Sequence, residues 1–186
     1  MMKNYRLTMI LLAFALAFTA LCAANPAAAA SAAEIDRDAR KALGDLYASS
    51  PAAKALGEKA IGILVFPGIV KGGFIVGGQY GEGALIKDGD AVAFYNSIAA
   101  SYGLQAGLQK FGYALFFMTD SALNWIDKSD GWEIGVGPSI VVVDVGAAAA
   151  MTSTTLQSDI YAFFFDQKGL MAGIGLQGTK ITKLDK

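Results

Sequence analysis

Hydrophobic and polar positions follow two different periods along the chain. From Ala32 to Ala60 the apolar residues recur every three or four positions, which predicts a helical segment with one buried face. Pro51 divides this segment into two helices, with Ser49 or Ser50 as the N-cap of the second. Beyond Lys59 the pattern becomes extended, with short apolar runs separated by turn residues. The chain is therefore expected to begin with helices and continue as a sheet.

The extended region is expected to contain a series of strands. Pro67-Gly68 is expected to end the first strand, whereas Lys87 to Asp90 and Asp166 to Gly169 are expected to form hairpin turns. Thr119 is expected to cap one short helix between strands. The predicted strands are Ile61 to Phe66, Gly72 to Ile86, Ala91 to Asn96, Ser101 to Gln109, Tyr113 to Met118, Trp132 to Val136, Ile140 to Ala147, Asp159 to Phe165 and Leu170 to Leu176. The predicted fold class is α+β: an N-terminal helical arm followed by a mainly antiparallel, glycine-rich curled sheet or barrel.

Glycines are concentrated in these strands, among β-branched and aromatic residues. They lack the Gly-Lys-Ser/Thr ending and the following helix of a phosphate-binding loop, so they are interpreted as sites of close strand packing. In Ser101 to Gln109, strict alternation predicts one apolar face and one small, polar face. The proposed structural glycines are Gly72, Gly73, Gly77, Gly78, Gly103, Gly107, Gly173 and Gly175.

The first 30 residues have the pattern of a secretory signal peptide. Lys3 and Arg6 precede an apolar run from Leu7 to Leu21, and a tract rich in alanine follows. Cleavage is expected after Ala30, within an A-x-A pattern. Cys22 raises the alternative of a lipid-anchored protein, although the leucine before it does not suit that signal. The protein is thus expected to be exported, either to the periplasm or to the outer membrane.

Composition limits the chemistry of the remaining residues, which are expected to form a single domain with a helical arm (31–60) and a sheet (61–186). The chain has 15 basic and 16 acidic residues and no basic stripe, so nucleic acid is not an expected partner. It has no histidine and a single cysteine, which excludes a Ser-His-Asp triad and imidazole-based zinc sites. No cofactor and no metal site is expected, and no pair of carboxylates is singled out by its spacing as catalytic.

Four segments together resemble the SYLF domain family. They are Ala60 to Gly83 (AIGILVFPGIVKGGFIVGGQYGEG), Ser101 to Gly107 (SYGLQAG), Gly135 to Pro138 (GVGP) and Ile160 to Gly178 (IYAFFFDQKGLMAGIGLQG). That family includes eukaryotic lipid-binding and actin-patch proteins and exported bacterial members. The resemblance implies binding of membrane lipid, binding of actin in some members, and no enzymatic activity.

A few side chains are candidates for contact with a lipid. Lys71 follows the Pro67-Gly68 turn and is a candidate for a lipid phosphate. Trp125 and Trp132 flank a loop containing Lys128, a combination that suits a membrane interface, although core packing also explains the tryptophans. The predicted function is a non-enzymatic lipid-binding or membrane-associating envelope protein, with anionic headgroups as possible partners. Two alternatives are a small outer-membrane β-barrel and a module that binds an envelope protein.

Overall fold

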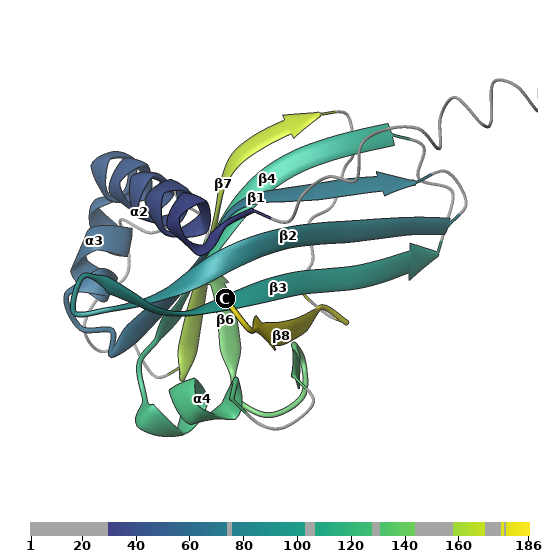
Figure 1. Ribbon diagram of the computed structural model, residues 1–186. Coiled ribbons are helices and arrows are strands. Elements are labelled where there is room, and N and C mark those ends of the chain that lie inside the picture. Colours follow the sequence, from purple (N-terminus) through teal and green to yellow (C-terminus); the bar gives the residue numbers. More distant parts are fainter. Residues whose placement is uncertain are drawn as a thin grey trace, which may run out of the picture. The chain divides into compact units, whose positions relative to one another are not determined.

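An eight-stranded sheet with helices packed against it forms the body of the protein (Figure 1). The computed structural model describes residues 30–73, 76–102, 107–127, 131–143, 158–169, 176 and 178–186. The helices are α2 (Ala32–Ser49), α3 (Pro51–Gly57) and α4 (Asp120–Trp125). The strands are β1 (Gly62–Gly73), β2 (Val76–Lys87), β3 (Asp90–Tyr102), β4 (Gly107–Phe117), β5 (Trp132–Glu133), β6 (Ile140–Val143), β7 (Ile160–Gly169) and β8 (Lys180–Leu184).

The strand order is β5-β8-β3-β2-β1-β4-β7-β6. Every pair of neighbours is antiparallel except β6 and β7, which run parallel. The sheet curls into a half-barrel whose edges are β5 and β6. The predicted α+β class, with a helical arm before a mainly antiparallel curled sheet, is confirmed.

Local chemistry determines where the helices begin. The Ser31 hydroxyl accepts a hydrogen bond from the Glu34 N–H, while the Glu34 carboxylate accepts from the Ser31 N–H, which completes a capping box. Pro51 occupies the first turn of α3, and the Ser50 side chain accepts from the Ala53 N–H. The predicted division of the helical arm at Pro51 is therefore confirmed, with Ser50 as the cap.

Helices α2 and α3 pack on one face of the sheet, which we call the outer face. The ring of Tyr47 in α2 lies 6.4 Å from that of Phe116 in β4, and Phe116 lies 5.2 Å from Phe163 in β7. Helix α2 also contacts β1, β2 and β3. The buried residues of the two helices are Ile35, Ala39, Ala42, Leu43, Leu46, Ala53 and Leu56. Burial of these side chains provides much of the favourable free energy that holds the helical arm to the sheet.

The opposite, inner face of the sheet carries a second core. Its buried side chains include Leu64, Phe66, Tyr113 and Phe117, and α4 covers them at one end with Leu123. The N-cap of α4 is Thr119, whose side chain accepts from the Ala122 N–H, as expected from the sequence. Both cores lie within Ser31–Lys186, which forms one compact unit.

Several predicted strand boundaries are wrong. Pro67-Gly68 does not end β1, because the strand continues through this pair as a bulge between Phe66 and Ile69. The stretch from Gly72 to Ile86 is not one strand: β1 ends at Gly73 and β2 begins at Val76. Asp166 to Gly169 is not a hairpin turn, since β7 extends to Gly169 with a register shift against β4.

The hairpin predicted at Lys87 to Asp90 is present, with Asp88 and Gly89 at φ angles of 51° and 88°. The proposed signal peptide up to residue 29, including Cys22, lies outside the described residues, as do 103–106 and 170–175. Among the residues that the structure describes, no helix is long and apolar enough to cross a membrane.

Candidate functional site

Large apolar side chains are exposed on the part of the outer face that α2 and α3 leave uncovered. Val70, Tyr80 and Ile98 are each between 46% and 49% exposed, although all three lie within long strands of the sheet. Val76 and Leu108 belong to the same face and are more exposed still. We call these five residues the exposed apolar patch. Figure 1 shows β1 to β4 continuing past the helices into this uncovered part of the sheet.

The register of the strands makes the patch continuous. Val70 in β1 pairs with Tyr80 in β2, and Tyr80 pairs with Ile98 in β3. Directly opposite residues of an antiparallel pair have Cβ atoms about 5 Å apart on the same face of the sheet. Leu108 lies in the next row, opposite Gly72. The patch is therefore one surface rather than several isolated side chains, and such surfaces commonly mark interaction sites.

Lysines border this row on both sides. Lys110 in β4 pairs with Val70, and Lys168 in β7 pairs with Lys110. On the other side, Lys180 in β8 pairs with Ile98 and has Glu133 of β5 opposite it. All three lysines, which we call the lysine border, are exposed. Neighbouring strands are about 4.8 Å apart, so the backbones of Lys110 and Lys180, which are four strand spacings apart, are separated by about 19 Å. The apolar row lies between them.

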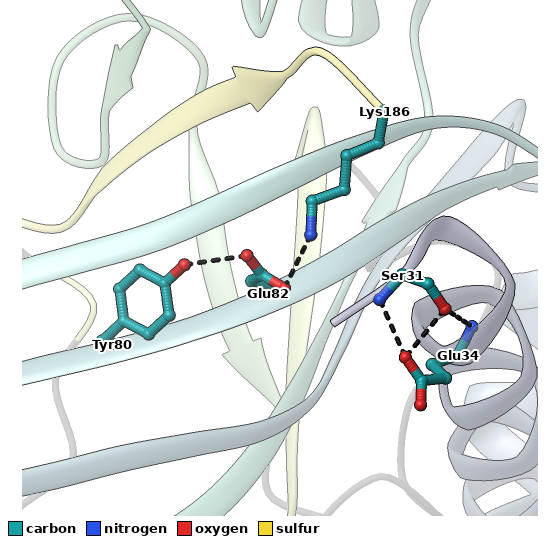
Figure 2. Close-up of polar contacts among 5 residues, drawn as sticks. All are labelled: Ser31, Glu34, Tyr80, Glu82 and Lys186. Carbon is teal, nitrogen blue, oxygen red and sulfur yellow. Dashed lines mark hydrogen bonds and ion pairs between the residues drawn. The ribbon is translucent and has the colours of Figure 1, made fainter. Parts of the chain in front are cut away.

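A partly buried ion pair lies where the patch meets the helix-covered part of the outer face. Glu82 accepts a hydrogen bond of 2.9 Å from the Tyr80 hydroxyl and forms an ion pair of 3.0 Å with Lys186 Nζ (Figure 2). The side chains of Lys186 and Glu82 are only 16% and 10% exposed. Burial, together with the hydrogen bond and charge of Glu82, raises the pKa of Tyr80 above its usual value.

The start of α2 lies next to this ion pair. Figure 2 shows Ser31 and Glu34 of the capping box beside Lys186. Hydrogen bonds from the Ser31 backbone and hydroxyl hold the pKa of Glu34 below its usual range, and the charges of Arg37 and Lys186 lower it slightly further. The capping box and the Glu82–Lys186 pair thus mark the boundary between the covered and uncovered parts of the outer face.

Of the residues proposed from the sequence as lipid contacts, Lys71 lies on the opposite face of the sheet from the patch. Lys71 is half-buried on the inner face, where it pairs with Gln79 and Gln109 across the neighbouring strands. Both glutamines are buried, and the Oε1 atom of Gln109 accepts no hydrogen bond within the described part of the chain. Lys128 lies outside the described residues.

The two tryptophans occupy different environments. Trp132 is 2% exposed, its indole N–H donates to the Val136 carbonyl at 3.0 Å, and its ring packs 6.3 Å from that of Phe117. Trp125 in α4 is half-buried against the inner core and lies against Gly137. The proposal of Trp132 as an interface residue is therefore corrected: it is a core residue with a satisfied indole. The structure does not bring the two tryptophans and Lys71 together in one site.

The proposed structural glycines differ in how closely their surroundings approach them. A Cβ atom added to Gly73 would lie 2.7 Å from the Val76 carbonyl oxygen, whereas one added to Gly78 would have no neighbour nearer than 3.7 Å. At Gly72 the nearest atom would be a methyl group of Leu108 at 3.3 Å. Gly107 has a φ of 154° in open surroundings and Gly77 lies in β2, while Gly103, Gly173 and Gly175 lie outside the described residues.

Sequence reasoning did not identify the patch or the lysine border. It placed Leu108 on an apolar face and Gln109 on a small, polar face, and in the structure Leu108 is 67% exposed whereas Gln109 is buried. The residues of the patch and the lysine border lie in six different strands and become neighbours only through strand pairing. A search for alternating strands with lysine at one outward position would have suggested Lys110, but not its neighbours.

A pocket of 540 Å³ lies at the opposite end of the sheet, beside the β2–β3 hairpin and α4. Its polar groups are largely paired: Asp127 accepts from the Tyr95 hydroxyl at 2.9 Å and forms an ion pair with Lys183 at 3.1 Å. Burial raises the pKa of Tyr95 well above its usual value, so this hydroxyl stays protonated at neutral pH. Within the described ranges, no three acidic or cysteine side chains are grouped as metal ligands.

Comparison with known proteins identifies the family of the second half of the chain. Residues 98–186 match the family Ysc84, described as "Las17-binding protein actin regulator". No curated protein matches the chain. The match includes Ile98, Leu108 and the whole lysine border, and this family is linked to lipid and actin binding through domains that are generally non-catalytic. Residues 98–186 thus match the model of the Ysc84/SYLF family that the sequence resembles.

Proposed function

We propose that this protein is a non-enzymatic lipid-binding protein that associates with a membrane surface through the exposed apolar patch. The observation that carries this proposal is the row of three exposed apolar side chains bordered by lysines across the outer face. Apolar side chains gain free energy when they leave water, and amines are attracted to anionic headgroups. One surface with both properties is suited to the interfacial region of a membrane.

The two contributions support each other energetically. Each lysine near an anionic surface contributes about 1 kcal/mol, so the lysine border alone supplies weak binding that salt screens. Insertion of the apolar patch adds a contribution that salt does not screen. Stable association of peripheral proteins commonly requires two such signals. We therefore propose anionic lipid headgroups as the partners of the lysine border.

We also propose that the protein is exported and acts at the cell envelope. This proposal rests on the leader pattern of residues 1–30, in which Lys3 and Arg6 precede the apolar run. Cleavage before Ser31 would release the compact unit Ser31–Lys186 intact, because the capping box that begins α2 lies entirely after that position. Mass spectrometry of the protein recovered from cells tests the cleavage site, and a retained leader would contradict it.

The test of lipid binding uses two substitutions in the same strand. Ile98→Asp places a negative charge in the patch, whereas Val92→Asp places one at a position of β3 that is 54% exposed and outside the patch. Ser31–Lys186 is sedimented with phosphatidylcholine vesicles that either contain or lack phosphatidylglycerol. We expect Ile98→Asp to weaken binding by about tenfold, which corresponds to a loss of about 1.4 kcal/mol, and Val92→Asp to change it by less than about twofold.

Two results would contradict the proposal. One is equal weakening by both variants, which would mean that the patch is not the contact. The other is an absence of binding of the unmodified protein to either vesicle, which would favour an envelope protein as the partner.

A further inference from the structure

Glu82 is a partly buried carboxylate directly beside the proposed membrane contact. It lies two residues from Tyr80 along β2, so the two side chains are on the same face of the sheet. The Tyr80 hydroxyl donates to Glu82 Oε1 at 2.9 Å, and Lys186 Nζ lies 3.0 Å from Glu82 Oε2. Figure 2 shows the three side chains in a line, from the patch at Tyr80 to Lys186 beside the start of α2.

The surroundings of Glu82 pair it with one cation, Lys186. Across the strand pair, Glu82 faces Asn96, whose Oδ1 atom is buried and accepts no hydrogen bond in the part of the chain that the structure describes. The carboxylate of Glu82 is paired with the positive charge of Lys186. Removing one partner of a buried ion pair leaves the other charge uncompensated, with little water to screen it.

We propose that Lys186 determines the lipid preference of the exposed apolar patch by neutralising Glu82. This inference rests on the proposed function. With Lys186 in place, the row that approaches the membrane carries the positive charge of the lysine border and no net negative charge from Glu82. Without Lys186, a carboxylate adjoins Tyr80 and repels anionic headgroups. One charge near such a surface changes the binding constant by about fivefold.

The experiment compares two ion pairs that involve neighbouring lysines of the chain. Lys186→Gln breaks the pair with Glu82, and Lys183→Gln breaks the pair with Asp127, which lies at the pocket end of the sheet. Both substitutions lower the net charge of Ser31–Lys186 by one, so a general charge effect would make them equivalent. Binding is measured with phosphatidylcholine vesicles and with vesicles of equal parts phosphatidylcholine and phosphatidylglycerol.

We expect Lys186→Gln to weaken binding to the anionic vesicles by about fivefold and to change binding to phosphatidylcholine by less than about twofold. Lys183→Gln is expected to change neither by more than about twofold. Adding Glu82→Gln to Lys186→Gln is expected to restore anionic binding, and Lys186→Arg is expected to preserve it because it keeps the positive charge.

The inference is overturned if Lys186→Gln weakens binding to both vesicle types equally, or if Lys183→Gln has the same effect on anionic vesicles. It is also overturned if the double variant stays as weak as Lys186→Gln. Should Lys186→Gln fail to fold, Glu82→Gln alone remains decisive, because it removes the negative charge, keeps Lys186 and is expected to strengthen anionic binding. If the unmodified protein binds neither vesicle, the proposed function fails together with this inference, whereas normal binding by Lys186→Gln refutes only the inference.

Discussion

The outer face of the sheet has two parts that are built from the same strands and differ in what covers them. In the part covered by α2 and α3, Phe116 and Val65 are fully buried, and the Phe116 ring packs against Tyr47 of α2. Further along the same strands, Val70 and Leu108 are exposed. Both parts present apolar side chains at alternate positions. An apolar position in a strand therefore becomes part of the core only where another element lies over it.

The lengths of α2 and β1 explain why the helix covers only part of the outer face. The 18 residues of α2 span about 27 Å at 1.5 Å per residue, whereas the 12 residues of β1 span about 40 Å. The helix is therefore too short to cover the strands along their whole length. Its capping box at Ser31 ends the cover beside Glu82, and the exposed apolar patch begins at Tyr80.

The largest expected difference between the two parts concerns stability. Phe116→Ala removes a ring packed between Tyr47 and Phe163, so we expect a loss of about 3–5 kcal/mol in the free energy of unfolding. Ile98→Ala removes a half-exposed side chain and should cost less than about 1 kcal/mol. Urea unfolding followed by circular dichroism measures both. Similar losses would show that the patch is covered by another part of the protein, which would contradict the difference between the two parts of the outer face.

A smaller effect on stability is expected when two glycines of β2 are replaced by alanine. At Gly81 an added Cβ would lie 2.6 Å from the Gly68 carbonyl oxygen and 3.2 Å from Ile69 Cα, both backbone atoms. At Gly78, on the uncovered outer face, the nearest atom would be at an ordinary 3.7 Å. We expect Gly81→Ala to destabilise the protein by about 1–3 kcal/mol and Gly78→Ala to change stability by less than about 1 kcal/mol. Thermal unfolding of both variants measures the difference, and a destabilised Gly78→Ala would indicate that the uncovered face is closely packed.

The smallest expected effect concerns the boundary between the two parts and depends on pH. Hydrogen bonds from Ser31 lower the pKa of Glu34 in the folded protein relative to its usual value of 4.5. Its contribution to stability is therefore complete above about pH 4.5 and is lost as the pH falls through the folded-state pKa. Glu34→Gln keeps an acceptor for Ser31 and does not titrate, so its stability should fall less on the acid side. Urea unfolding from about pH 6 to about pH 3 tests this, and parallel curves would contradict it.

Elements with strong local signals were predictable from the sequence. Pro51 and the serine before it divide the helical arm, Thr119 caps α4, and the residues around Gly89 form the β2–β3 hairpin. Each of these depends on hydrogen bonds or backbone angles within a few residues. The boundary between β1 and β2 was missed, because a glycine-rich run continues across Gly73 with the same composition on both sides.

The candidate site was much less predictable. Tryptophan is typical of membrane interfaces, but the indole N–H of Trp132 donates to the Val136 carbonyl and its ring is buried in the inner core. Lys71 lies on the inner face because the bulge after Phe66 changes which side of β1 each later residue occupies. The residues adjacent in sequence do not predict either position, because both depend on pairing with distant strands.

The sequence by itself determined the α+β class, the helical arm, the family of its second half and the absence of histidine chemistry. Those features follow from periodicity, caps and composition, which act over short distances along the chain. The tertiary structure alone decided that Val70, Tyr80 and Ile98 form one row, that lysines border it, and that Glu82 is paired with Lys186. Glu82 and Lys186 are 104 residues apart, and only the pairing of β8 with β3 brings them together. A surface assembled from separate strands depends on register, which no single segment of sequence specifies.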